Sequence, residues 1–160
     1  MMSERLWNQM NSLKNEFANI KHQIAPGLKF SNNSNDIEFL NQFPFHTEES
    51  VIACEKLLQT DNDIKEKFKH FLHSIGGVDA KSHIRRILNK LFSNKFAINC
   101  SWTGRAFEKN MSKYKIQNLQ IIAVMKCVIK NDHQLYSESS FENDVQSWFR
   151  TAKTRFDREQ

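Results

Sequence analysis

The pentapeptide Ser-Trp-Thr-Gly-Arg, residues 101–105, combines residue types that could bind an anion. A glycine in a turn lets backbone N–H groups come close to a ligand. The guanidinium of Arg105 offers a planar fork of donors that suits a phosphate group or the edge of guanine. Trp102 is expected to bury its ring and so to position Thr103 and Gly104. A plain interhelical turn with a solvated Arg105 is the alternative that these residues leave open.

Other residues with reactive side chains form weaker patterns. His70 and His73 have a helical spacing that can ligate a metal ion, but no further ligand lies at a companion spacing, so we predict no metal and no cofactor. Cys54, Cys100 and Cys127 are odd in number and lie in apolar contexts, which is typical of reduced core thiols. Phosphate loops of the GxxxxGK[ST] and GxGxxG types are absent. We therefore expect a protein without enzymatic activity.

Positive charge is concentrated around the pentapeptide. Residues 81–115 contain nine lysines and arginines against one acid, Glu108, whereas the whole chain has a net charge of +5. Residues 36–63 show the opposite bias, with seven acids and one lysine. This segregation favours a face that binds phosphate, although a solvated helix surface would have the same composition.

The element that must position the pentapeptide is a helix predicted for residues 80–92. Apolar residues recur at a spacing of three and four on one of its faces, and Arg85 and Arg86 lie on the other. Further helices are expected from the N-cap Thr47 to about residue 59, from Asp61 or Asp63 to the Gly76-Gly77 pair, around 116–129, and from Ser139 to about 156. The last of these is expected to bury Trp148.

A separate helix is predicted near the N-terminus. Apolar residues alternate there at spacings of four and three, as in the a and d positions of heptads. They are Leu6, Met10, Leu13, Phe17, Ile20 and Ile24. This seam could join two copies of the chain in a short coiled coil, or it could dock on the chain's own domain.

Composition limits the architecture. The 160 residues include 13 Phe and 3 Trp but only 4 Gly and 2 Pro, which favours one helical globular domain over a β fold with many turns. We predict an all-α, compact domain of about five to six helices at residues 43–158, a linker at 27–42 and the heptad helix at 1–26. No secretory signal and no run of ~18 apolar residues is evident, so a soluble intracellular protein without membrane contact is expected.

Several segments carry a resemblance to known families. Residues 88–105 are similar to the middle of BEN domains, in which a helix ending in Leu-Phe precedes a Ser-x-Thr-Gly-Arg/Lys signature. The chain looks closer still to a domain-of-unknown-function family. The shared segments are Phe43-Pro44, Thr47 to Glu49, Ser74 to Gly77, Arg85 to Leu88, and Ser101 to Arg105.

The BEN resemblance implies a helical domain that binds duplex DNA in transcription or chromatin regulation, in the nucleus or alternatively the cytoplasm. It implies DNA contacts for Arg105 and, on the final helix, for Arg150, Lys153, Thr154 and Arg155. The basic window adds Lys109, Lys113 and Lys115. The alternative is a protein-interaction scaffold that self-associates through the heptad helix, recruits protein co-regulators and ignores nucleic acid.

Overall fold

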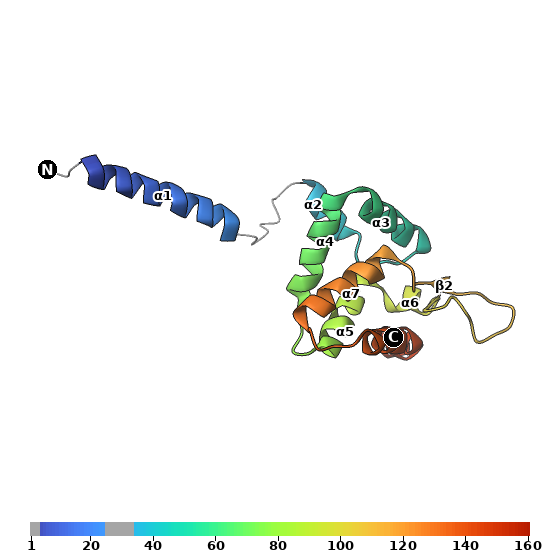
Figure 1. Ribbon diagram of the computed structural model, residues 1–160. Helices are drawn as coiled ribbons and strands as arrows, with labels where there is room; N and C mark the ends of the chain where they lie inside the picture. The colour runs from blue at the N-terminus through green and yellow to red at the C-terminus, as the bar shows by residue number, and fades with distance from the viewer. Residues whose placement is uncertain (1–3, 25–33) are drawn as a thin grey trace. The chain divides into compact units, whose positions relative to one another are not determined.

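The computed structural model describes residues 4–24 and 34–160, with side chains described for 4–16 and 38–160. The chain divides into two compact units between residues 36 and 37. The first contains α1 (Glu4–Ile24). The second is mostly helical (Figure 1). Its elements begin with α2 (Ser34–Asn41), which crosses the division, followed by α3 (Glu48–Thr60), α4 (Asn62–Ile75), α5 (Ala80–Leu91), α6 (Asn94–Ala97), β1 (Cys100–Ser101), β2 (Tyr114–Lys115), α7 (Gln120–Asp132), α8 (Glu138–Arg150) and α9 (Ala152–Glu159).

The prediction of an all-α domain with five to six helices was correct only in part. Strands β1 and β2 form a small parallel sheet in which Cys100 is paired with Tyr114. The range predicted to hold five to six helices contains seven, α3 to α9, and nine helices occur in the described part of the chain. Strands of two residues are too short to leave a periodic pattern in the sequence. Helix α2 lies inside the range interpreted as a linker, and its Phe39 is buried against Phe43 and Phe68.

Local capping signals explain where several helices begin. Thr47, Asp61 and Asp79 accept backbone hydrogen bonds at the starts of α3, α4 and α5, and the first two are caps that the sequence predicted. Asp79 and Ser82 form a reciprocal capping box. The prediction for the last helix was wrong, because Ser137 rather than Ser139 is the N-cap of α8. Gly76 ends α4 with a positive φ of 57°.

Helix α7 receives its cap from a distant residue. No side chain at its own N-terminus accepts a hydrogen bond. Instead the carboxylate of Glu55 on α3 accepts the backbone N–H groups of Gln120 and Ile121 at 2.7 and 2.8 Å. Glu55 is buried, and the partial positive charge of a helix N-terminus stabilises an acid there. This contact ties the acidic half of the domain to its most apolar helix.

The core lies between the helices of the second unit. The most extensive helix contacts join α5 to α8, α4 to α7 and α6 to α9 (Figure 1). The apolar face predicted for α5 is buried, and Val51, Cys54 and Leu58 of α3 are buried too, whereas Leu57 of α3 is exposed. The backbone of Phe45 pairs with the end of α5, because its N–H donates to Leu91 and its carbonyl accepts from Ser93. This pairing joins the segment before α3 to the turn between α5 and α6.

The predicted final helix is two helices, α8 and α9, that meet at Thr151. Trp148 is buried as expected, and so are four other apolar residues: Phe141, Val145, Phe149 and Ala152. The hydroxyl of Thr151 donates to the carbonyl of Ser147. The break sends α9 along α6, so the cations predicted to lie on one final helix lie on two helices.

Candidate nucleic-acid interface

The pentapeptide does not join two helices, as the sequence suggested, but begins the loop 102–113 between β1 and β2. The loop is closed at its base. Lys113 donates its backbone N–H to the carbonyl of Gly104 at 2.9 Å, and the Ser101 hydroxyl donates to the carbonyl of Arg105 at 3.1 Å. Arg105 and Ser112 form an isolated antiparallel bridge. The loop therefore leaves the sheet as a narrow, hydrogen-bonded projection (Figure 1).

Glycine is required at position 104 of this loop. Its φ is +81°, in the region that side chains with a Cβ rarely adopt. A Cβ at this position would lie 3.1 Å from the Cβ of Lys115 and 3.3 Å from the carbonyl oxygen of Lys113. The glycine predicted to let the backbone approach a ligand thus lets the two sides of the loop approach each other.

A cavity of about 220 Å³ lies between this loop and α8. Three cations, Arg105, Lys113 and Arg150, border it, and none of its lining residues is acidic. The remaining lining residues are Cys100, Ser101, Trp102, Thr103, Phe107, Gln146 and Phe149. No side-chain hydrogen bond or ion pair joins the three cations to another residue in the described part of the chain. We call this the loop cavity.

The loop cavity brings together predicted residues that are far apart in the sequence. Arg150 is the last residue of α8, and Gln146 lies one turn earlier on the same face. Trp102 is buried as predicted, and Thr103 is exposed. Sequence reasoning missed Gln146 and Phe107, although the i, i+4 spacing of Gln146 from Arg150 was a signal that could have identified the former.

The other predicted contact residues lie outside the loop cavity. Lys109 is exposed near the tip of the loop, and Lys115 is exposed on β2. Lys153 and Thr154 are exposed on α9. These four side chains lie on the surface but do not line the loop cavity.

Arg155 has a different environment from the other predicted cations. Its guanidinium stacks on the ring of Trp148 at 3.9 Å from the centroid. Nε donates to Asn94, and Nη1 donates to the Trp148 carbonyl and to the Thr151 hydroxyl. Trp148 in turn donates its indole N–H to Asn89 on α5. Arg155 therefore holds α9 to α6 and α8, with most of its donors already used.

A second basic surface borders α8 on its other side. A groove of about 250 Å³ lies between α5 and α8, with Lys81 and Arg85 facing Ser147 and Thr151. Arg155 and Asp144 also line it. The groove has an acid and a hydrogen-bonded arginine in its wall, so its cations are partly offset, unlike those of the loop cavity.

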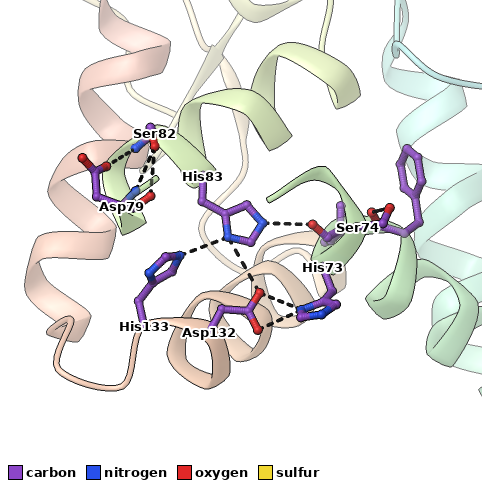
Figure 2. Close-up of polar contacts among 9 residues, drawn as sticks. His73, Ser74, Asp79, Ser82, His83, Asp132 and His133 are labelled. Carbon is purple, nitrogen blue, oxygen red and sulfur yellow. Dashed lines mark hydrogen bonds and ion pairs between the residues drawn. The ribbon is translucent and has the colours of Figure 1, made fainter. Parts of the chain in front are cut away.

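A polar cluster lies where α4, α5 and the end of α7 meet (Figure 2), and His83 is its buried member. His83 is 1% exposed, and its Nε2 donates to the carbonyl of Leu72 at 3.0 Å. Its Nδ1 lies 3.2 Å from Nε2 of His133 and 3.8 Å from a carboxylate oxygen of Asp132. Asp132 also contacts His73 at 2.8 Å. The cluster satisfies its own polar groups and so joins three helices.

Metal binding and nucleophilic chemistry are the other roles that the described histidines and cysteines could have. No group of three or more potential ligands in the described residues could hold a metal ion. Burial raises the pKa of Cys54 to about 12 and that of Cys100 to about 12, and the charges of Glu55 and Glu48 respectively add to this effect. Cys54 and Cys100 are therefore buried thiols as predicted, whereas Cys127 is exposed and the core assignment for it was wrong. Its position on α7 falls on the side away from the buried face.

Within the described residues, no helix combines the length and apolar character needed to cross a lipid bilayer.

Comparison with known proteins identifies the domain but not its ligand. Searches of curated proteins and of solved structures each gave no match. A family profile matches residues 39–124, which is more than half of the chain and includes α3, α5, the sheet and the loop 102–113. The chain therefore belongs to the family described as Domain of unknown function (DUF4806).

Proposed function

We propose that this protein binds duplex DNA through the loop cavity and the end of α8, as a DNA-binding or chromatin-associated regulator of transcription in the nucleus. One observation carries the proposal. Arg105, Lys113 and Arg150 come from two separate segments of the chain and border one cavity that has no acidic residue. Like charges are gathered in this way when an anion offsets their repulsion.

The distribution of free donors supports phosphate as that anion. The three cations have no partner side chain in the described residues, so they can contact the DNA backbone without breaking an internal contact. Lys109 and Lys115 extend the positive surface along the loop and β2. The resemblance to BEN domains favours the same ligand, with the C-terminal helix in the major groove and the loop on phosphates.

A titration at several salt concentrations tests this proposal. A fluorescent duplex is titrated with the full chain between 50 and 200 mM salt. A plot of log K against log salt concentration has a slope of about −0.9 for each phosphate that the protein neutralises. Three contacts therefore predict a slope of about −2.7 or steeper. Absence of binding at low salt, or an affinity that ignores salt, would contradict the proposal.

A matched pair of variants assigns the binding to this site. The triple variant Arg105→Ala, Lys113→Ala, Arg150→Ala is expected to lose most of the slope. The control variant Lys56→Ala, Lys65→Ala, Lys130→Ala removes the same charge from α3, α4 and α7. If both triple variants lose affinity equally, general charge rather than the loop cavity binds the DNA.

A protein-interaction scaffold is the second candidate function, supported by α1. Leu6, Met10 and Leu13 of the predicted seam are exposed, as is Trp7 next to them. The side chains of Phe17, Ile20 and Ile24 lie outside the described residues. Exposed apolar residues at heptad spacing are expected to bury themselves in a second copy of the helix or in a co-regulator.

Light scattering distinguishes self-association from binding to another protein. The intact chain is compared with a chain that lacks residues 1–26. Self-association through the seam predicts a dimer that becomes a monomer on deletion. An unchanged oligomeric state on deletion would exclude self-association through the seam.

A further inference from the structure

The loop cavity has features that phosphate binding does not explain. Three aromatic side chains line it: Trp102, Phe107 and Phe149. The amide of Gln146 lies in the same wall. A site for phosphate alone needs donors and positive charge, and an aromatic surface contributes little to it.

Phe107 is the most unusual of these residues. It is fully exposed, at 108% of its reference area, although it lines the cavity edge on a loop that projects from the domain (Figure 1). Leaving such a ring in water forfeits the free energy that burial of a phenylalanine provides. Cations lie close to it in the sequence on both sides, at Arg105 and Lys109. An exposed ring between cations is the arrangement with which proteins stack bases while holding the backbone.

The size of the cavity limits what can enter. At about 220 Å³ it lies below the roughly 300–1,000 Å³ of sites that enclose drug-sized ligands. A helix of a partner protein or the stacked bases of a duplex would not fit inside it. A single flat ring system would fit, with one face toward an aromatic side chain and its polar edge toward an amide.

We propose that the loop cavity holds one unpaired nucleobase, stacked on Phe107 and hydrogen-bonded by Gln146, while Arg105, Lys113 and Arg150 hold the phosphates on either side. This proposal rests on the proposed function, because it specifies which DNA the site prefers. An amide side chain can both donate to and accept from a base edge, so Gln146 suits any of the four bases. The protein then binds a duplex with an extrahelical base more tightly than a fully paired one, because the cost of unstacking that base is already met.

The test compares two duplexes of the same length. One is fully paired, and the other carries a single-nucleotide bulge occupied by the fluorescent base 2-aminopurine. The full chain is expected to bind the bulged duplex more tightly by roughly 5- to 100-fold, the range that stacking of one base on an aromatic side chain provides. The fluorescence of the 2-aminopurine is expected to change on binding, as its base moves onto the ring of Phe107.

Variants of the loop separate stacking from charge. Phe107→Ala is expected to lose the preference for the bulge while retaining its affinity for the paired duplex and its salt slope. Phe107→Tyr is expected to restore the preference, since it retains a ring. Met111→Ala is the matched control, because Met111 is an exposed apolar residue of the same loop, at 65%, that does not line the cavity. Gln146→Ala is expected to weaken the preference in part.

The possible failures are distinguishable. If the chain binds both duplexes equally and with the expected salt slope, the base site is wrong and the proposed function stands. If Phe107→Ala weakens both duplexes equally, the ring contributes general affinity and the base site is again wrong. If neither duplex binds at low salt, the proposed function itself fails. Binding of a free nucleoside monophosphate as tightly as the bulged duplex would replace DNA with a mononucleotide as the ligand.

Discussion

Arg150 and Arg155 are five residues apart, yet the two regions that contain them differ in how their charges are used. At the junction of α8 and α9, Arg155 stacks on Trp148 and makes three hydrogen bonds to α6, α8 and the linking Thr151. At the loop cavity, Arg150 lies with Arg105 beside open space and has no partner side chain in the described residues. Both regions are basic, but Nε and Nη1 of Arg155 are used within the fold and only its Nη2 has no partner, whereas the side-chain donors of Arg105 and Arg150 are all unused in the described residues.

The difference separates cations that stabilise the fold from cations that can bind a ligand. Removing a donor that is used internally leaves buried acceptors unsatisfied, so the free energy of unfolding falls. Removing a donor that faces an empty cavity leaves the fold intact and changes only binding. Each of the following variants is therefore assayed for both stability and DNA affinity.

His83→Ala is expected to have the largest effect on stability, because every described contact of the His83 side chain lies within the fold. His83 is buried, donates to the carbonyl of Leu72 and contacts His133. Its loss leaves a cavity and an unsatisfied carbonyl, so the free energy of unfolding should fall by about 3 kcal/mol. Urea unfolding measures this. His73→Ala is the control, since the side chain of His73 is 63% exposed and its contact with Asp132 should contribute less than about 1 kcal/mol.

Arg155→Ala tests the junction itself. It removes the contact with Trp148 and the hydrogen bonds that link α9 to α6, so we expect a loss of about 2 kcal/mol in urea unfolding. Arg155→Lys should recover only part of this, because an ammonium cannot reproduce the planar fork. Lys153→Ala, on the exposed side of α9, is the control for helix and charge effects. A drop in DNA affinity without a drop in stability would place Arg155 with the binding residues instead.

The sequence allowed much of the helical framework to be predicted because its signals are local. Thr47, Asp61 and Asp79 cap helices through contacts within a few residues, and the buried face of α5 follows from its spacing. The β1–β2 pairing and the Glu55 cap of α7 depend on residues far apart in the chain. Only the folded structure brings such partners together, so a periodic pattern does not reveal them.

The candidate site, like the fold, was predicted from the sequence only in part. The pentapeptide pattern identified Arg105 as a candidate, the BEN resemblance implied both Arg105 and Arg150, and both residues border the loop cavity. The same resemblance also implied Arg155, on a helix expected to continue past Arg150 to about residue 156. The break at Thr151 turns Arg155 onto Trp148. Exposed cations of equal charge therefore require tertiary contacts before their roles can be separated.

Arg150→Ala is expected to lower DNA affinity and to leave stability almost unchanged, the opposite of what is expected for Arg155→Ala. We expect DNA affinity to fall by about three- to tenfold and the salt slope to decrease by about 0.9, the value for one phosphate contact. Urea unfolding should change by less than about 0.5 kcal/mol, as for surface substitutions generally. An equal loss in Lys153→Ala would show that position on the loop cavity does not matter.

The smallest expected effect concerns the reactivity of the cysteines, which tests whether solvent reaches the wall of the loop cavity. Burial raises the pKa of Cys100, in that wall, and of Cys54, in the core, each from about 9 to about 12. Alkylation of the native protein at pH 8 should therefore modify only the exposed Cys127, as mass spectrometry of peptides would show.

The same shifts set a pH dependence. The unfolded chain loses its thiol protons above pH 9 while the folded chain keeps them, so stability is complete below pH 9 and declines as the pH rises above it. Thermal unfolding at pH 8 and pH 10 would detect this decline, and Cys54→Ala should reduce its steepness. In the alkylation experiment, rapid modification of Cys100 at pH 8 would contradict a closed wall and show that the structure behind Arg105 and Arg150 opens in solution. The loop cavity and the junction at Arg155 would then differ in local opening as well as in how their charges are used.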